Sequence, residues 1–172
     1  ISMKKLKQLL EKEHSKKQKD VITSEILKNN IVISDLIQLV KSNKGIYAQR
    51  GAYVITGIQD TNINLLAPYT SDLWKCIHPE SHPSIPRAVY RYLSAVETPK
   101  ELDGEIFEQG TKDFVNKKTT IAVKAHIMKT ITNLAIKYPE LKDEVIFLIN
   151  QQLKGSSAGY KSTAKKELKR LI

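Results

Sequence analysis

A basic residue recurs every 37 residues along this chain of 172 residues, at Arg50, Arg87, Lys124 and Lys161. The residue after each of them is small, and these four residues are Gly51, Ala88, Ala125 and Ser162. A fixed period of about 20 to 50 residues is typical of stacked supersecondary units. The recurrence therefore predicts a repeat array, a solenoid, in which each unit buries its apolar face against the next.

Apolar residues in the last two periods follow helical spacing. Val123, Ile127, Ile131 and Leu134 correspond, one period later, to Tyr160, Ala164, Leu168 and Leu171. The segment 53–55 is β-branched enough to resemble a strand, but the other copies of its unit are helical, so we predict a helix there. The segment 145–149 is apolar throughout, which predicts burial on several sides. Only 7 glycines and 6 prolines also argue against a turn-rich all-β fold. The prediction is an all-α fold.

The helical pattern divides into about five pairs, each with a first helix and a second helix that carries the basic residue. The expected pairs are 3–13 with 16–28, 34–43 with 46–58, 68–77 with 85–96, 99–115 with 119–137, and 139–153 with 157–172. They form units 3–30, 34–60, 67–97, 98–137 and 138–172 of a single domain. Ser15 with Gln18, and Thr98 ahead of Pro99, are expected to cap two of the helices. Glu13 stands where the first unit would carry its basic residue, so we expect that unit to be an N-terminal cap.

A two-helix unit whose second helix opens with a basic residue and then a small one resembles the HEAT repeat. The resemblance covers residues 34–172 well and 3–30 loosely, with Gln49 and Pro86 departing from the usual residue before the basic position. It implies an α-α superhelix that presents its second helices to a partner on the concave face. The segments 122–125 and 157–161 are also similar to small stand-alone bacterial HEAT-like proteins, some of which carry the label adenylosuccinate lyase. The lyase family's Ser-Ser-x-Met-Pro-x-Lys-x-Asn loop is absent here, so the sequence does not support that activity.

The net charge of +10 is concentrated at the two ends of the chain. Residues 1–30 carry eight basic and four acidic side chains, and residues 139–172 carry seven and four. Lysine-rich ends keep a helical protein in solution, and a basic surface also attracts nucleic acid. Charge alone leaves these two interpretations open.

The basic column of Arg50, Arg87, Lys124 and Lys161 has two interpretations. Its members can bond acceptors of the adjacent unit and form a structural ladder, or they can line the concave face and bind phosphates. Lys165 and Lys169 extend the basic character of the last helix, one and two turns beyond Lys161. These six residues are the candidate binding residues.

Cys76, His78 and His82 are grouped around two prolines, and Cys and His are zinc ligands. Their spacing matches none of the common structural zinc patterns, so no metal site is expected. Cys76 lies on an apolar stripe with Leu73 and Ile77, which predicts a buried thiol rather than a nucleophile. The chain also lacks a Gly-rich phosphate loop and a nucleophile elbow, so we expect neither a cofactor nor catalysis.

One cysteine and the absence of a long apolar run predict a cytoplasmic chain, without a disulfide framework or a membrane span. Lysines interrupt the N-terminal apolar residues, so no signal peptide is expected. Whether Ile1 and Ser2, which precede the first methionine, are native stays open. We expect a monomer or weak oligomer.

The leading functional hypothesis is a binding scaffold for a partner protein. The alternative is a nucleic-acid-binding protein, resembling the DNA alkylation-repair glycosylases in architecture. Those enzymes need aromatic and acidic residues around a flipped base. Asp72 and Trp74 are candidates by type, but they fall on a first helix, which counts against the enzyme.

Overall fold

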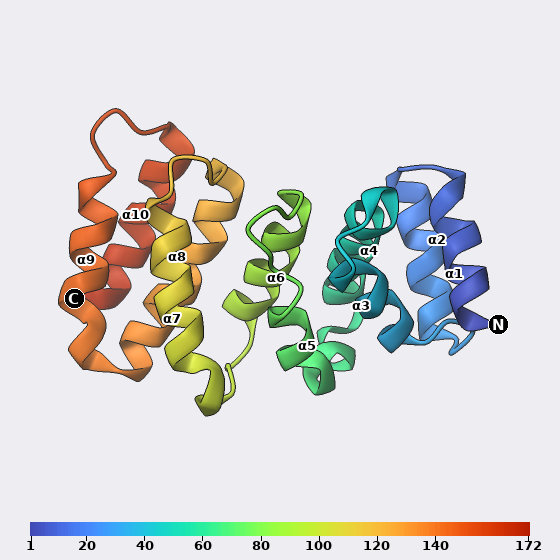
Figure 1. Ribbon diagram of the computed structural model, residues 1–172. Helices are drawn as coiled ribbons and strands as arrows, with labels where there is room; N and C mark the ends of the chain where they lie inside the picture. Colours follow the sequence, from blue (N-terminus) through green and yellow to red (C-terminus); the bar gives the residue numbers. More distant parts are fainter. The chain divides into compact units, whose positions relative to one another are not determined.

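The computed structural model describes residues 1–172, and all of its regular secondary structure is helical (Figure 1). The elements of the first half are α1 (Ser2–Lys12), α2 (Lys16–Leu27), α3 (Ile33–Lys41), α4 (Gly45–Asn62), the 3₁₀ helix η1 (Ile63–Tyr69), α5 (Thr70–Trp74) and α6 (Ser84–Ala95). The second half consists of α7 (Lys100–Val115), α8 (Ile121–Lys137), the 3₁₀ helix η2 (Pro139–Leu141), α9 (Lys142–Gln151) and α10 (Ala158–Leu171). No helix has both the length and the apolar character needed to cross a bilayer.

The predicted all-α architecture of about five helix pairs is confirmed, with most ends within a few residues of the expected ones. The segment 53–55 lies inside α4 and is helical, as predicted. The first helix of the third pair differs most. The sequence predicted a helix over 68–77, whereas the chain forms η1 followed by the five-residue α5. Pro68 lies inside η1. Because proline has no backbone N–H to donate, it disrupts an α-helix that runs through it, so 63–74 does not form one continuous α-helix.

Two compact units make up the chain, residues 1–92 and residues 93–172, and the division falls within α6. Each unit has its own apolar core. In the first, the completely buried side chains include Leu6, Leu36, Ile55, Ile58 and Leu66. In the second they include Ile106, Phe114, Ile127, Ile131 and Ile149.

The predicted helical stripe of the last two periods is confirmed. Val123, Ile127, Ile131 and Leu134 are buried on α8, and on α10 only Leu168 of the corresponding four is partly exposed. The expectation for 145–149 is wrong in part. Val145 and Ile149 are buried, but Phe147 is 63% exposed. The helix α9 packs against α8 and α10, so its buried side follows Val145 and Ile149 and the opposite side, with Phe147, is left to solvent.

Polar caps define several helix starts. Ser15 accepts a hydrogen bond from the backbone N–H of Gln18, as predicted, and Thr120 and Ser157 cap α8 and α10 in the same way. The predicted Thr98 cap is wrong, because its hydroxyl donates to the carboxylate of Asp103 instead. A charged acceptor forms a stronger hydrogen bond than a neutral one, which explains the preference.

Two glycines in α4 allow close packing in the first unit. A Cβ at Gly51 would lie 2.8 Å from Cγ2 of Val40 on α3, and a Cβ at Gly57 would overlap the hydroxyl of Thr23 on α2. Only glycine lets the backbone of α4 approach both helices so closely. This approach brings polar residues of α2 and α4 side by side.

Candidate functional site

The basic column keeps its register in the structure. Arg87, Lys124 and Lys161 are the fourth residues of α6, α8 and α10, and Arg50 is the sixth residue of α4. All four thus lie in the first two turns of second helices. The surroundings of the four side chains are nevertheless different.

Arg50 is tied to the first helix of the preceding pair. Its guanidinium Nη1 donates to the carbonyl oxygens of Leu10 at 2.7 Å and of Glu11 at 3.4 Å, in the last turn of α1. The last carbonyls of a helix have no partner within it, and they attract a cation through the helix dipole. Tyr47 supports this contact from the same helix, because its hydroxyl donates to the carboxylate of Glu11. Arg50 therefore has a structural contact of the ladder type.

Lys124 is bonded in the other direction along the chain. Its Nζ donates to Oε1 of Gln152 at 2.7 Å, and Nε2 of Gln152 donates to the carbonyl of Phe114 at 3.2 Å. Burial lowers the pKa of Lys124, because the charged ammonium loses part of its hydration. Lys124 thus helps to join α8, the C-terminal end of α9 and α7.

Arg87 and Lys161 are exposed and make no side-chain hydrogen bond or ion pair. The four basic residues therefore share a sequence register without sharing one chemical role. Two of them hold helices together, and the other two are free cations on the surface.

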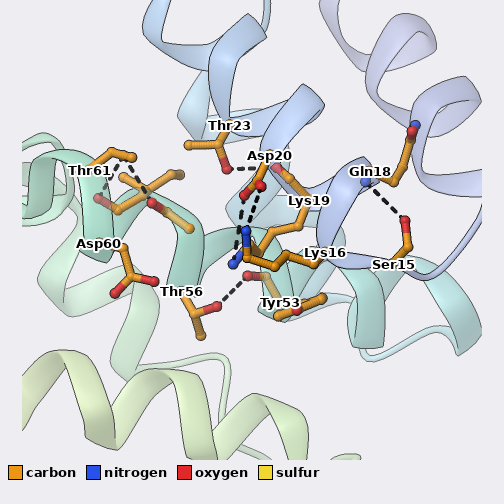
Figure 2. A network of polar contacts seen from close by, with 12 residues as sticks. Ser15, Lys16, Gln18, Lys19, Asp20, Thr23, Tyr53, Thr56, Asp60 and Thr61 are labelled. Carbon is orange, nitrogen blue, oxygen red and sulfur yellow. Dashed lines mark hydrogen bonds and ion pairs between the residues drawn. The ribbon is translucent and has the colours of Figure 1, made fainter.

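A polar surface lies on the second helices of the compact unit formed by residues 1–92, and we call it the second-helix surface. It consists of Lys16, Lys19 and Asp20 of α2, Gln49, Tyr53, Thr56 and Asp60 of α4, and Arg91 of α6. The four α4 residues follow the spacing i, i+4, i+7 and i+11, which places them on one face of the helix. Figure 2 shows three α2 members, Lys16, Lys19 and Asp20, with three α4 members, Tyr53, Thr56 and Asp60.

Tyr53 is the aromatic centre of this surface. The ammonium of Lys19 lies 4.8 Å from the centroid of its ring, and the ring of His14 packs against it edge-on at 5.3 Å. On α2, Lys16 and Lys19 both reach the carboxylate of Asp20, at 3.2 and 3.8 Å (Figure 2). The Tyr53 ring is therefore contacted by Lys19 and His14, and the residue is half-buried.

Arg91 extends the surface to α6. Its guanidinium forms an ion pair with Asp60 and donates to the carbonyl of Thr56 at 3.3 Å. Sequence reasoning did not identify Tyr53, Asp60 or Arg91 as binding residues. The spacing of residues 49, 53, 56 and 60 on one face of a helix is the signal in the sequence that could have indicated the α4 part. Nothing in the local pattern links Asp60 to Arg91, which lies 31 residues later.

The last helix carries a cationic surface, the α10 lysine face, made of Lys161, Lys165, Lys166 and Lys169. All four side chains are exposed and have no ion-pair partner. The opposite side of α10 packs through Tyr160, Ala164 and Leu171, which are buried. The structure therefore places the predicted Lys161, Lys165 and Lys169 on one exposed face of a single helix.

Cys76, His78 and His82 do not converge. Cys76 is completely buried, as predicted, with its thiol near the carbonyl of Asp72 at 3.3 Å. His78 contacts the carbonyl of Lys41 at 3.0 Å, and His82 contacts the hydroxyl of Ser84 at 2.8 Å. No group of three or more His, Cys, Asp or Glu side chains is placed to hold a metal ion. Burial raises the pKa of the Cys76 thiol to about 12, so the thiol stays protonated at neutral pH.

One of three comparisons with known proteins finds a match, and it agrees with the repeat pattern of the helices. No curated protein sequence and no solved structure matches the chain. A family model described as a HEAT repeat domain matches residues 6–171, which is nearly the whole chain. Adenylosuccinate lyase finds no support in these comparisons. Together with the paired helices and the basic residues in register on the second helices, the match shows that the chain belongs to the HEAT repeat family.

Proposed function

We propose that this chain is a non-enzymatic binding module that docks a partner protein on the second-helix surface of residues 1–92. The observation that carries the proposal is the combination of Tyr53 with the Asp60–Arg91 ion pair on one face of α2, α4 and α6. Membership of a helical-repeat family supports it, because such arrays use an extended face of one helical layer for binding.

The composition of the surface favours a protein partner. Tyr and Arg are enriched in protein–protein interfaces and dominate their binding energy, because each combines a large contact area with directional hydrogen bonds. Here Tyr53 is held by Lys19 and His14, and Arg91 is held by Asp60 and Thr56. Side chains that are already ordered lose little conformational entropy when a partner binds. The surface is therefore preorganised.

Site-specific photo-crosslinking tests this proposal. A photo-crosslinking amino acid replaces Gln49, on the surface, or Ser71, which is exposed on α5. We expect a discrete crosslinked partner from position 49 in cells that express the chain, and none from position 71. The same partner from both positions, or from neither, would contradict the proposal.

A matched pair of charge substitutions then tests the surface itself. Thr56→Lys adds a cation and bulk beside Tyr53, while Ser71→Lys makes the same chemical change on α5. Thr56→Lys should abolish the crosslink from position 49, and Ser71→Lys should preserve it. Melting curves of both variants check that the fold is intact. Loss of the crosslink in both variants, or in neither, would count against the second-helix surface.

A further inference from the structure

The α10 lysine face repeats one charge along one side of a helix. Lys161, Lys165 and Lys169 follow one another at intervals of four residues, and Lys166 lies beside them. At a rise of 1.5 Å per residue these three residues are about 6 Å apart along the axis, so the row is about 12 Å long. All four lysines are exposed.

Nothing on α10 neutralises these lysines. The one acidic residue of the helix, Glu167, is only 3% exposed, and its carboxylate is bonded to Arg170 at 2.6 Å. Arg170 is itself held by the side chain of Asn133 on α8, also at 2.6 Å. Glu167 is therefore buried and paired with Arg170, and the α10 lysine face contains no acidic residue.

Helix stability does not account for this arrangement. Like charges at i and i+4 repel one another and destabilise a helix by about 0.2 to 0.5 kcal/mol per pair. Lys161 also lies in the first turn, where the helix dipole disfavours a cation, and only Lys169 of the row lies in the last turn, where the dipole favours one. A face that served only solubility would be more stable with acids interspersed among the lysines. A ligand that supplies negative charge along the row would relieve both unfavourable terms.

The chemistry between the lysines indicates the kind of ligand. The other exposed residues of α10 are Ala158, Gly159, Ser162 and Arg170, so the face has no aromatic or large aliphatic side chain. Protein interfaces are depleted in lysine and depend on apolar anchors, and a helix lying on a membrane needs an apolar face to insert. A phosphate backbone needs neither. With one phosphate per 3.4 Å of axis on each strand, a row about 12 Å long faces three to four phosphates.

We propose that α10 binds the phosphate backbone of nucleic acid through Lys161, Lys165, Lys166 and Lys169, without reading the base sequence. Phosphate contacts fix the position of a protein on a duplex, and they carry no sequence information. This interaction is separate from the partner-protein surface, which is built from α2, α4 and α6.

Anisotropy of a labelled 20-base-pair DNA duplex across a salt series tests the proposal on the full chain. Four phosphate contacts predict that raising the salt from 50 to 200 mM weakens binding about 150-fold. Lys165→Gln/Lys169→Gln removes two contacts and should reduce that loss to about 12-fold. Both positions are exposed and glutamine is a good helix former, so the melting temperature should not fall, and loss of the repulsion between neighbouring lysines should raise it slightly.

The matched control is Lys4→Gln/Lys44→Gln, which removes the same charge from exposed lysines of the other compact unit. It should keep the wild-type salt dependence. If both double variants reduced the salt dependence of binding by the same amount, only net charge would matter and the proposal would be overturned. It would also be overturned if the duplex failed to bind at 50 mM salt. Tighter binding of a polyglutamate peptide, or of phosphatidylserine vesicles, at the same salt would assign the face to a different class of partner.

Discussion

Asp103 joins the start of α7 to the end of α8. Its carboxylate is buried, since the residue is only 4% exposed. Its carboxylate accepts hydrogen bonds from Thr98 and from the hydroxyl of Tyr138 at 2.6 Å, and it pairs with Lys137 at 2.7 Å. Burial by itself would raise the pKa of Asp103, but the hydrogen bonds from Lys137, Thr98 and Tyr138 outweigh it and hold the pKa below the usual value. A buried charge is tolerated here because all of its partners are in place.

Asp103→Asn should lower the free energy of unfolding by about 1 to 3 kcal/mol at pH 7, because it removes charged hydrogen bonds. Because the folded pKa is lowered, the stabilisation is present above the unfolded value near 3.9 and is lost as the pH falls through the folded pKa. The difference between wild type and variant should therefore shrink as the pH falls below about 4. Thermal melts from pH 7 to pH 3 measure this, with Glu105→Gln on the exposed side of α7 as the control. A difference that stays constant with pH would refute the assignment.

Substituting a hydrogen-bonded member of the basic column should cost more stability than substituting a member without a partner. Lys124→Ala leaves the side chain of Gln152 without its donor and should cost about 1 to 3 kcal/mol. Arg87→Ala removes an exposed side chain without a partner and should change stability by less than about 0.5 kcal/mol. Denaturant unfolding of the two variants compares them directly. Equal costs would mean that the contact of Lys124 with Gln152 is not what stabilises α8.

At the scale of the element, α4 depends on its glycines. Gly57 faces α2, where an added Cβ would meet Thr23 and the side chain of Lys19. The hydroxyl of Thr23 is itself bonded to the carbonyl of Lys19 at 2.8 Å, so it has little freedom to move away. The position of Tyr53 beneath Lys19 depends on this close approach of the two helices.

Gly57→Ala should destabilise the fold by roughly 1 to 3 kcal/mol, because overpacking outweighs the gain in helix propensity of about 1 kcal/mol. Gly104→Ala is the matched control within α7, since nothing lies within 4 Å of a Cβ at that position. It should stabilise by about 0.5 to 1 kcal/mol. Opposite signs of the two changes in melting temperature are the expected result. A stabilising Gly57→Ala would show that α2 and α4 have room to separate.

Over the full chain, each of the two compact units has buried residues of its own, so stability is expected to be local. Repeat arrays gain stability from each unit and its nearest neighbours, and different regions open with different free energies. Ile131 is completely buried in the core of residues 93–172.

Ile131→Ala should cost about 2 to 5 kcal/mol, as large-to-small changes in a core do. Amide hydrogen exchange measured by mass spectrometry should become faster in α7 to α10 and stay unchanged in α1 to α4. Leu102→Ala, at a half-buried position of the same unit, should have a smaller effect with the same distribution. An equal increase in exchange over both units would show that the chain opens as one cooperative body.

The helices, the repeat register and most of the core could be predicted from the pattern of residues along the chain. These features are periodic and local, so the stripe of Val123, Ile127, Ile131 and Leu134 could be recognised without knowing what it packs against. The same logic identified the second helices and placed the four basic residues near their starts. It did not extend to Phe147, because apolar character does not show which side of a helix has a neighbour.

The partners of the polar side chains, in contrast, depend on how distant helices pack. Arg50 and Lys124 have the same place in the repeat, yet Arg50 bonds a carbonyl 40 residues earlier and Lys124 an amide 28 residues later. Thr98 was expected to cap a helix, but its hydroxyl donates a hydrogen bond to the carboxylate of Asp103. The pairing of Asp60 with Arg91 joins two helices and has no local signature. A hydrogen bond acts over about 3 Å and depends on which helix ends meet, and that is set by packing between distant segments rather than by the pattern within any one of them.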